Sequence, residues 1–411
     1  MNILLAAYAC EPDKGSEPEV GWQMVTGLAK AMPKDNIYVI TKANNKTAIE
    51  NKGYAENISF IYYQLPKYIS FWKKGGRGIR TYYYLWMIGA TIHIKFKKLP
   101  LDIVHHITFV NDWMPSFFCF LKNNNNSFIW GPIGSHDSVN LKFCSGIKKK
   151  IVSKLTDFIK YIFRNFDPFF LICKNKADYI IGINKYVHKS LKLKGDKNFI
   201  PEPAIALPAC YIIDYHDVTY EDSFNIISIG RLTYLKNFKL SILAFSKFLK
   251  TQNCNKNIKL QIIGNGEDKL TLQKLVKDLD ISRHVEFIGY IPLVEVHSYL
   301  SKAKVFLFPS LENAGFVTLE AMSHSLPVVA LDYGGSQQFV KNNMENQLVP
   351  ESIPYSEITS RLATNLEVFF NDKELLKAVG QQNREDVLKY FTWEAKCNKI
   401  SNLYQQISNE A

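Results

Sequence analysis

Short, nearly continuous apolar runs alternate along the chain with stretches whose apolar residues recur at helical spacing. In the first half these runs lie at 3–9, 37–43, 58–65, 102–109, 128–132 and 178–183; in the second half they lie at 224–230, 259–266, 285–290, 305–310 and 327–332. Strands that are apolar on both faces and separated by helices are typical of parallel sheets covered by helices on both sides. The pattern therefore predicts an α/β protein built from doubly wound parallel sheets.

This alternation is interrupted once, at residues 201–223, and then starts again. The interrupting stretch is rich in proline and acidic residues and lacks helical periodicity, which indicates a linker between domains. A length of 411 residues also fits two domains. We expect Rossmann-like domains over 1–210 and 211–392 that face a cleft, with a C-terminal helix at about 393–411 returning to the first domain. Ligands should bind at the carboxyl ends of the strands.

The formal net charge of +12 narrows the range of partners. A basic protein favours an anionic partner, such as a nucleic acid, a phospholipid surface or a phosphorylated substrate. Residues 67–98 hold eight Lys or Arg and no acidic residue, and residues 142–200 hold fourteen Lys or Arg against four Asp. The excess of positive charge therefore lies in the N-terminal half.

The seven cysteines are scattered singly and form no C-x-x-C pair, which indicates reduced thiols in a cytoplasmic protein. No basic segment precedes the first apolar run, so we expect no signal peptide. No stretch reaches the roughly 18–20 apolar residues of a membrane-spanning helix. The sequence predicts a cytoplasmic protein, and contact with the inner face of the membrane stays open.

The turn after the strand at 224–230 carries the first candidate chemistry. Gly230 ends the strand, and Arg231 and Lys236 flank the start of a helix. Helix amides, the helix dipole and two cations form a natural site for a diphosphate. Two solvated basic residues on a surface helix are the alternative. Gly264 and Gly266 follow the next strand but lack the third glycine of G-x-G-x-x-G, so a tight turn is the more common reading.

The most informative stretch is 309–340, where two carboxylates flank a helix start. Glu312 lies in the loop after a strand, and Glu320 lies in the first turns of the following helix. Gly315 allows close backbone approach at that helix N-terminus, which predicts a second phosphate site. A carboxylate beside a sugar or ribose accepts hydrogen bonds from its hydroxyl groups. The alternative is a helix-dipole glutamate and an exposed loop glutamate.

Taken together, these motifs resemble glycosyltransferase family 4, the retaining transferases of the GT-B fold. The matching elements are G-R-L-x-x-x-K-N, G-x-G, V-x-F-x-G, two Glu separated by seven residues, E-A-M, P-V-V-A and D-x-G-G, in this order across 230–340. The resemblance implies that Arg231 and Lys236 hold the donor diphosphate, that Glu320 binds ribose and that Glu312 contacts the donor sugar. The full donor-binding set that it implies is Gly15, Ser16, Arg231, Lys236, Gly264, Gly266, Tyr290, Ile291, Gly315, Phe316, Val317, Thr318 and Glu320.

The resemblance continues into the N-terminal half through the motifs at 7–24, 71–80, 102–109 and 130–134, so it covers nearly the whole chain. It implies that the loop at Gly15 and Ser16 closes over the donor phosphates. His105 and His106 end a strand, and since adjacent strand residues point to opposite faces, at most one can touch donor or acceptor. The catalytic candidates are therefore His106, His105 and Glu312, and of the two histidines His106 is preferred. A packed core histidine is the alternative.

The loop that follows the two histidines contributes Asp112 and Trp113 as candidates to line the acceptor pocket. Three positions depart from the family pattern: Ser135 and Ser325 replace common glycines, and Gln338 replaces a usual glutamate. None of them is at a phosphate-binding position. They bear on the fit of the acceptor more than on donor binding.

The segment 67–98 mixes its basic residues with aromatic ones. Such a helix suits an anionic membrane surface, which would help an enzyme with a lipid-linked acceptor. A core helix with a basic edge is the alternative. The aromatic residues in question are Tyr68, Phe71, Trp72, Tyr82, Tyr83, Tyr84 and Trp86.

The resemblance predicts glycosyl transfer from a nucleotide sugar to a glycan or lipid-linked acceptor with retention of configuration, in bacterial surface polysaccharide synthesis. Fixed cations and amides would stabilise the charge of the leaving diphosphate, so we expect neither a cofactor nor a metal ion. The alternatives are a phosphorylase of the same fold with pyridoxal phosphate, a non-catalytic sugar-binding relative, and a nucleic-acid binder. The motifs argue against the last, and we expect no nucleic-acid partner.

Overall fold

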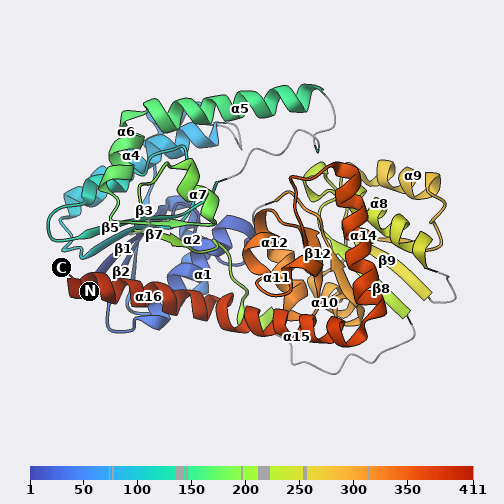
Figure 1. The fold of residues 1–411 in the computed structure, drawn as a ribbon. Coiled ribbons are helices and arrows are strands. Elements are labelled where there is room, and N and C mark those ends of the chain that lie inside the picture. The colour runs from blue at the N-terminus through green and yellow to red at the C-terminus, as the bar shows by residue number, and fades with distance from the viewer. Residues whose placement is uncertain are drawn as a thin grey trace. The chain divides into compact units, whose positions relative to one another are not determined.

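The computed structural model describes residues 1–73, 75, 78–135, 143, 147–195, 198–211, 223–252, 257–312 and 315–410 (Figure 1). The chain divides into two compact units. Unit 1 comprises residues 1–138, 145–204 and 393–411, and unit 2 comprises residues 139–144 and 205–392. Of the stretch expected to be a linker, residues 212–222 lie outside the described residues. Each unit is an α/β domain with a parallel sheet, which confirms the predicted fold class.

Unit 1 is built on a parallel sheet in which the described strands follow the order β3-β2-β1-β4-β5-β6-β7. The strands are β1 (Asn2–Ala6), β2 (Asn36–Lys42), β3 (Ile58–Tyr63), β4 (Ile103–His106), β5 (Ser127–Ile133), β6 (Tyr179–Gly182) and β7 (Phe199–Pro201). The helices are α1 (Ser16–Ala31), α2 (Lys46–Lys52), α3 (Lys67–Ser70), α4 (Ile79–Lys97), α5 (Ile147–Phe166), α6 (Pro168–Lys176), α7 (Lys185–Ser190) and α16 (Trp393–Glu410). Residues Ile3–Ala6 of β1 are fully buried between helices, as expected for a central parallel strand.

The first apolar run, 3–9, extends beyond its strand because the loop that follows is itself buried. The strand β1 ends at Ala6, whereas Ala7, Tyr8 and Ala9 are still buried. The loop packs directly on α1: a Cβ on Gly21 would lie 2.0 Å from the carbonyl oxygen of Ala9. Periodicity therefore located the strand correctly but overestimated its length.

The aromatic helix α4 lies in the core of unit 1. Tyr82, Tyr83 and Trp86 are buried, and the indole Nε1 of Trp86 donates to the carbonyl oxygen of Tyr63 at 3.0 Å. This corresponds to the core alternative for this part of 67–98. Tyr68 and Phe71, which precede α4, and Phe96 near its end are strongly exposed.

The C-terminal helix α16 packs against α1 inside unit 1. The helices approach closely at Gly27, where an added Cβ would lie 2.5 Å from Sγ of Cys397. Figure 1 shows α16 in red beside the sheet of unit 1. The last segment of the chain thus completes the domain that the first segment begins.

Unit 2 repeats the architecture with the strand order β10-β9-β8-β11-β12-β13. The strands are β8 (Ser223–Ile229), β9 (Asn257–Ile263), β10 (Val285–Gly289), β11 (Val305–Leu307), β12 (Val328–Leu331) and β13 (Leu348–Val349). The helices are α8 (Phe238–Thr251), α9 (Lys269–Asp278), α10 (Leu293–Lys302), α11 (Phe316–Ser323), α12 (Gly334–Phe339), α13 (Met344–Gln347), α14 (Tyr355–Asn371) and α15 (Lys373–Tyr390). Phe245, Phe248 and Phe306 are fully buried in its core.

In each sheet the strand order reverses once, beside the first strand of the unit. In unit 1 the chain proceeds outward from β1 in one direction and from β4 in the other; in unit 2 the same occurs at β8 and β11. Loops diverge at such a switch point and leave a crevice at the carboxyl ends of the strands, where ligands of open α/β sheets bind. The fold alone therefore directs attention to the loops after β1, β4, β8 and β11.

Among the described residues, no helix combines the length and the apolar character that crossing a bilayer requires.

Candidate functional site

The loops after β8 and β11 are joined to each other at the switch point of unit 2. The amide of Leu311 donates to the carbonyl oxygen of Leu235 at 2.8 Å, and the side-chain amide of Asn237 donates to the carbonyl oxygen of Pro309 at 3.2 Å. These bonds connect the short 3₁₀ turn Tyr234–Lys236 to the loop that carries Glu312. Two motifs about 75 residues apart in sequence thus form one rigid rim.

Lys236 and Glu312 meet on this rim as an ion pair. Lys236 Nζ lies 2.6 Å from Glu312 Oε2, and the two side chains are 15% and 33% exposed. The ammonium also lies 5.2 Å from the centre of the Phe308 ring, a cation–π distance. The carboxylate and the ring hold the ammonium in place, while a lysine keeps further N–H donors for a ligand.

Arg231 also lies in the loop after β8. Its side chain is exposed, and it makes no hydrogen bond or ion pair with any described residue. Since guanidinium groups bind phosphate through paired N–H donors, an exposed arginine beside Lys236 leaves that capacity unused in the free protein. The structure therefore places the two predicted phosphate ligands in one loop.

Gly264 and Gly266 have a packing role in the structure. A Cβ on Gly264 would lie 2.0 Å from the carbonyl oxygen of Gly230, and a Cβ on Gly266 would lie 2.3 Å from that of Leu232. Both glycines let the loop after β9 close against the loop after β8. This favours the tight-turn reading over direct ligand contact, and it makes both residues supports for the Arg231 loop.

The N-terminus of α11 completes this group of loops. Gly315 caps the helix with φ at +63°, and an added Cβ there would lie 2.7 Å from Cα of Gly335, so only glycine fits. No described backbone carbonyl accepts from the amides of Phe316 and Val317, as expected for a first helical turn. The buried hydroxyl of Thr318 also has no hydrogen-bond partner among the residues that the structure describes. This end of the helix carries donors suited to an anion.

Glu320 lies one turn further along α11 and is buried. Its side chain is 4% exposed, and no described group forms a hydrogen bond or an ion pair with its carboxylate. Burial raises the pKa of Glu320 to about 7. A buried carboxylate without a partner costs folding free energy, which is typical of a group kept for binding or catalysis.

Tyr290 and Ile291 follow the edge strand β10. The phenol ring of Tyr290 is 84% exposed, whereas Ile291 packs partly against the core. The loop is held by the amide of Gly264, which donates to the carbonyl oxygen of Gly289 at 2.8 Å. The loops after β8, β9 and β10 therefore form a continuous row, which includes Tyr290 of the predicted donor-binding set.

In unit 1, Gly15 and Ser16 stand at the start of α1. Both have positive φ, +67° and +53°, and both are exposed. Sequence reasoning missed the residue that follows: Glu17 Oε1 accepts the amide of Phe109 at 2.7 Å and so joins α1 to the loop after β4. Burial raises the pKa of Glu17, and the Phe109 amide partly opposes this shift. An acidic residue in a first helical turn was the available signal.

The two histidines that end β4 are both engaged inside unit 1. Nε2 of His105 donates to the carbonyl oxygen of Gly131 at 2.6 Å, and its Nδ1 faces the hydroxyl of Tyr404 on α16. His106 contacts the hydroxyls of Tyr83 at 2.7 Å and Ser116 at 2.8 Å. Burial lowers the pKa of each to about 3. The structure favours the packed alternative for both, including the preferred His106, and a catalytic role remains a prediction.

Replacing Tyr404 by phenylalanine should destabilise the protein. Because Nε2 of His105 donates to a carbonyl, its Nδ1 must accept from Tyr404, and the variant leaves a buried acceptor unpaired. We expect a loss of about 1–3 kcal/mol in the free energy of unfolding, measured by urea denaturation. Tyr68→Phe, at a 77% exposed ring, is the matched control. Equal stability of the two variants would contradict the structural role of His105.

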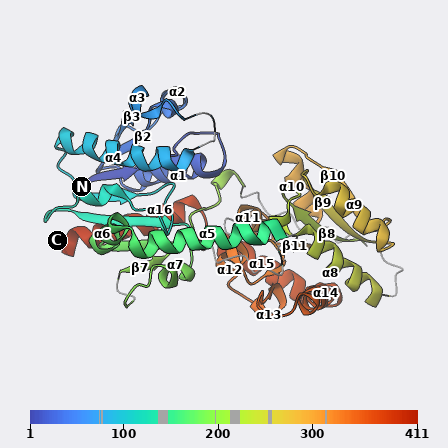
Figure 2. The ribbon, with the colours of Figure 1, turned by 90° about the horizontal axis from the view of Figure 1, so that it is seen from above.

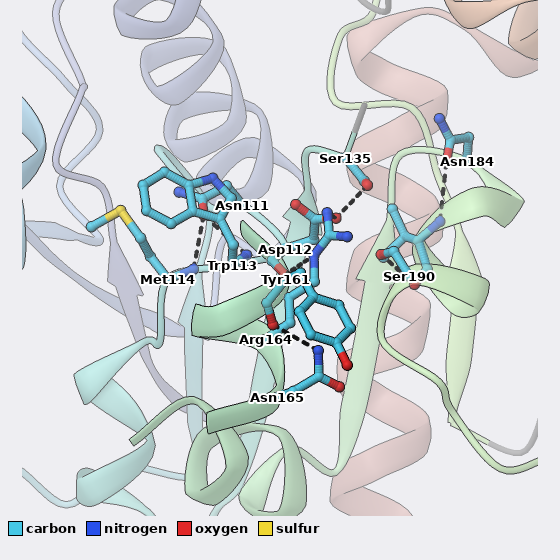
Figure 3. Close-up of polar contacts among 11 residues, drawn as sticks. Asn111, Asp112, Trp113, Met114, Ser135, Tyr161, Arg164, Asn165, Asn184 and Ser190 are labelled. Atoms are coloured by element: carbon cyan, nitrogen blue, oxygen red, sulfur yellow. Dashed lines mark hydrogen bonds and ion pairs between the residues drawn. The ribbon is translucent and has the colours of Figure 1, made fainter. Parts of the chain in front are cut away.

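Asp112 is the centre of a polar cluster rather than part of an open pocket (Figure 3). It is 1% exposed, and its carboxylate accepts hydrogen bonds from the hydroxyl of Ser135 and from the guanidinium of Arg164. Arg164 Nε also donates to the carbonyl oxygen of Asp112 at 3.0 Å. Trp113 is half-buried, and the guanidinium carbon of Arg80 lies 4.9 Å from the centre of its ring. Trp113 stays a candidate for acceptor contact.

Two of the three family departures have local explanations. Ser325 has φ at +57°, a conformation that glycine adopts without strain, which accounts for the common glycine there. The side-chain amide of Gln338 donates to the carbonyl oxygen of Gly334 at 3.1 Å. Such a bond needs an N–H donor, which the usual glutamate lacks when ionised.

Comparison with known proteins shows similarity to glycosyltransferases. Residues 216–386 match the family model of glycosyl transferases group 1. An uncharacterized glycosyltransferase of Methanocaldococcus jannaschii is 27% identical over 186 residues, 45% of each chain. The amylovoran biosynthesis glycosyltransferase of Erwinia amylovora is 33% identical over 134 residues, covering 31% of this chain and 32% of that one. The chain thus aligns with less than half the length of these two relatives.

Solved structures match along the entire chain. Sucrose-phosphate synthase from Thermosynechococcus elongatus has a TM-score of 0.65 at 18% identity and covers 100% of both chains. A protein of Anabaena solved in complex with UDP has a TM-score of 0.59 at 12% identity, also over 100% of both. These likenesses show the fold: two parallel-sheet α/β domains of the GT-B class. The group 1 glycosyl transferase match lies in unit 2, where the Lys236–Glu312 rim is found.

Proposed function

We propose that the protein is a glycosyltransferase that takes a nucleotide sugar as donor in unit 2. The observation that carries this proposal is the set of groups at the β8/β11 switch point. There, the cations of Arg231 and Lys236 lie on the loop after β8. The first two N-terminal amides of α11 and the buried carboxylate of Glu320 have no partner among the described residues, and α11 follows the loop that is bonded to the β8 loop. This set is complementary to a diphosphate joined to a hydroxyl-rich sugar or ribose.

In this proposal each group has a defined role. Arg231 and Lys236 neutralise the diphosphate, and the amides of Phe316 and Val317 donate to its oxygens. Glu320 accepts hydrogen bonds from ribose hydroxyls, and Glu312 contacts the donor sugar while it orients Lys236. Tyr290 lies beside the base. The family resemblance supports these assignments, as does the position of the residues on neighbouring loops.

The proposed chemistry is transfer with retained anomeric configuration. The bond between the anomeric carbon and the diphosphate breaks, and the acceptor oxygen attacks on the same face. The leaving phosphate takes the acceptor proton. Cations and amides that already point at the diphosphate stabilise its developing charge, so the step needs no metal ion or other cofactor in this proposal.

The relatives suggest a pathway and a nucleotide. One relative is named for amylovoran biosynthesis, and one solved neighbour was crystallised with UDP. We propose that this chain acts in bacterial surface polysaccharide synthesis, on a glycan or lipid-linked acceptor, and that UDP sugars are the first donors to test. We also propose a cytoplasmic location, since Cys10, Cys119, Cys173 and Cys397 are free thiols.

A panel of nucleotides tests the donor site directly. We expect one of UDP, GDP or ADP, or its sugar conjugate, to raise the melting temperature of the wild-type protein. At a ligand concentration 100 times Kd, the stabilisation should be about 2.7 kcal/mol. The variant Arg231→Ala should lose most of this response, whereas Lys239→Ala, at an exposed lysine on α8, should keep it.

The same panel separates the alternatives. Absence of any response from wild-type protein would argue against a nucleotide-sugar transferase. A nucleotide response without turnover or hydrolysis of any nucleotide sugar would favour a non-catalytic relative of this fold. A phosphorylase would instead carry pyridoxal phosphate on a lysine, which its visible absorbance reveals.

A further inference from the structure

Helix α5 carries a wide apolar stripe in a strongly basic sequence. Ile151, Leu155, Phe158 and Ile162 follow each other at intervals of four, three and four residues, so they share one face. Residues 147–166 hold six Lys or Arg and one Asp. An amphipathic helix of this composition would normally turn its apolar face to the protein core.

The orientation of α5 is the reverse of that expectation. Ile151, Leu155 and Phe158 are 60%, 57% and 59% exposed, and Ile162 is also exposed. The polar residues Asp157, Lys160 and Arg164, in contrast, are half-buried. The helix therefore turns its polar side towards unit 1 and its apolar side outward. Several large apolar side chains of α5 are therefore exposed, which is unusual for a surface that contacts only water.

The contacts of Arg164 and Phe163 with unit 1 explain the orientation of α5. Arg164 is nine residues after Leu155, which at about 100° per residue places the two on opposite sides of the helix. Arg164 forms a partly buried ion pair with Asp112 (Figure 3). The ring of Phe163 also contacts the ring of Trp113. These contacts fix which side faces unit 1. Figure 2 shows α5 as a long helix along one flank of unit 1, with its first half extending beyond the sheet.

The stripe continues towards the C-terminal end of the helix and beyond. Phe166 is 68% exposed, and Leu171 and Ile172 on α6 are 36% and 38% exposed. Among the described side chains of α5, the basic residue Lys154 is exposed beside the stripe. Exposed apolar side chains beside a lysine, on a helix of net positive charge, are complementary to the surface of a bilayer with acidic lipids, where an anionic headgroup layer covers an apolar interior.

We propose that α5 is an in-plane membrane helix that binds anionic lipid bilayers through its outward apolar stripe. Ile151, Leu155, Phe158 and Ile162 insert below the headgroups, and Lys154 contacts lipid phosphates. This surface differs from the segment 67–98, whose helix contributes Tyr82, Tyr83 and Trp86 to the core. The inference does not depend on the donor chemistry of unit 2.

Co-sedimentation of the full-length protein with vesicles tests the proposal. We expect binding to vesicles of phosphatidylcholine with about a third phosphatidylglycerol and much weaker binding to phosphatidylcholine alone. High salt should weaken the binding, because surface charges are screened. The double variant Leu155→Glu, Phe158→Glu should bind at least about tenfold more weakly, since it removes inserted apolar groups and adds two negative charges. Lys154→Glu should give a smaller loss.

Two controls keep the test specific. Leu270→Glu changes a 79% exposed leucine in unit 2, and Phe71→Glu changes a 78% exposed residue of the segment 67–98. Both should bind like wild type. The melting temperature and the nucleotide response of every variant should stay unchanged, because the altered side chains are exposed; a failure of the donor proposal is therefore seen separately.

Three outcomes would overturn the membrane proposal. The first is absence of wild-type binding to anionic vesicles. The second is equal binding by wild type and the Leu155→Glu, Phe158→Glu variant. The third is a wild-type dimer in solution, measured by light scattering, that this variant converts to a monomer; a second copy of the chain would then cover the stripe.

Discussion

Replacing Lys236 by methionine should lower turnover of the nucleotide-sugar donor by about 10²–10³-fold. The ammonium is the one partly buried cation among the described residues of the β8 and β11 loops, and Glu312 and Phe308 fix its position. Methionine keeps most of the length and apolar volume of the side chain, so the loss reports on charge rather than packing. Initial rates of donor hydrolysis or transfer, taken at saturating donor, give the measurement.

A double-mutant cycle tests whether the loss of turnover in Lys236→Met depends on the ion pair with Glu312. Glu312→Gln alone removes both the sugar contact and the charge that orients Lys236, so the two single effects should overlap and the double variant should lose less than their sum. Lys239→Met provides the matched control on α8, where the lysine is exposed. Turnover of Lys236→Met within about threefold of wild type, with donor saturating, would remove this residue from the catalytic machinery.

The sequence predicted the fold class because parallel sheets leave a strong apolar signal. Strands such as β1, buried on both faces, appear as continuous apolar runs that no surface element imitates. The same property caused the errors in length: the buried loop Ala7–Cys10 is as apolar as the strand before it. Apolar character reports burial, and only backbone geometry decides where a strand ends.

The candidate donor-site residues could be selected from the sequence because their chemistry is local. A glycine at a strand end, a cation near a helix start and a glutamate one turn into a helix are all visible in short windows of sequence. Their joining is not: the bonds from Leu311 to Leu235 and from Asn237 to Pro309 connect loops far apart along the chain. The sequence also cannot show that Gly264 and Gly266 serve loop packing, because the neighbours they touch belong to another loop.

The histidines illustrate the opposite case. Their position at a strand end made His105 and His106 candidates for ligand contact. The groups that bond to their nitrogens come from α4, α16, strand β5 and the loop after β4. Tyr404 is 299 residues away from His105. No local pattern distinguishes a histidine that awaits a ligand from one that is fully bonded by distant residues. Glu17 was overlooked for the same reason, since its partner Phe109 lies on another loop.

Glu320→Gln should stabilise the free protein while it removes nucleotide binding. Burial raises the pKa of Glu320 from 4.5 to about 7, so the folded state holds its proton more tightly than the unfolded state. The contribution of this group to stability is fully present below pH 4.5 and is lost as the pH rises through about 7. Integrated over that window, the ionised form costs about 3 kcal/mol. Glutamine carries no charge and avoids this cost at any pH.

Urea denaturation of wild type and Glu320→Gln at pH 4.5 and pH 8 measures the effect. The two proteins should be similar at pH 4.5, and at pH 8 the variant should be more stable by up to about 3 kcal/mol. Glu385→Gln, at an exposed glutamate on α15, should show no such pH dependence. A variant less stable than wild type at pH 8 would mean that the carboxylate has a partner in the folded protein.

Nucleotide affinity of the same two proteins, measured as a function of pH, tests the proposed function of Glu320. If ribose hydroxyls donate to the ionised carboxylate, wild-type affinity for the nucleotide should rise with pH between 4.5 and 7 and level off above, because binding must first remove the proton. Glu320→Gln should bind weakly and show no such rise. Stability and binding then change in opposite directions at one residue. That combination is expected of a group retained for its ligand, and a purely structural glutamate would lose both together.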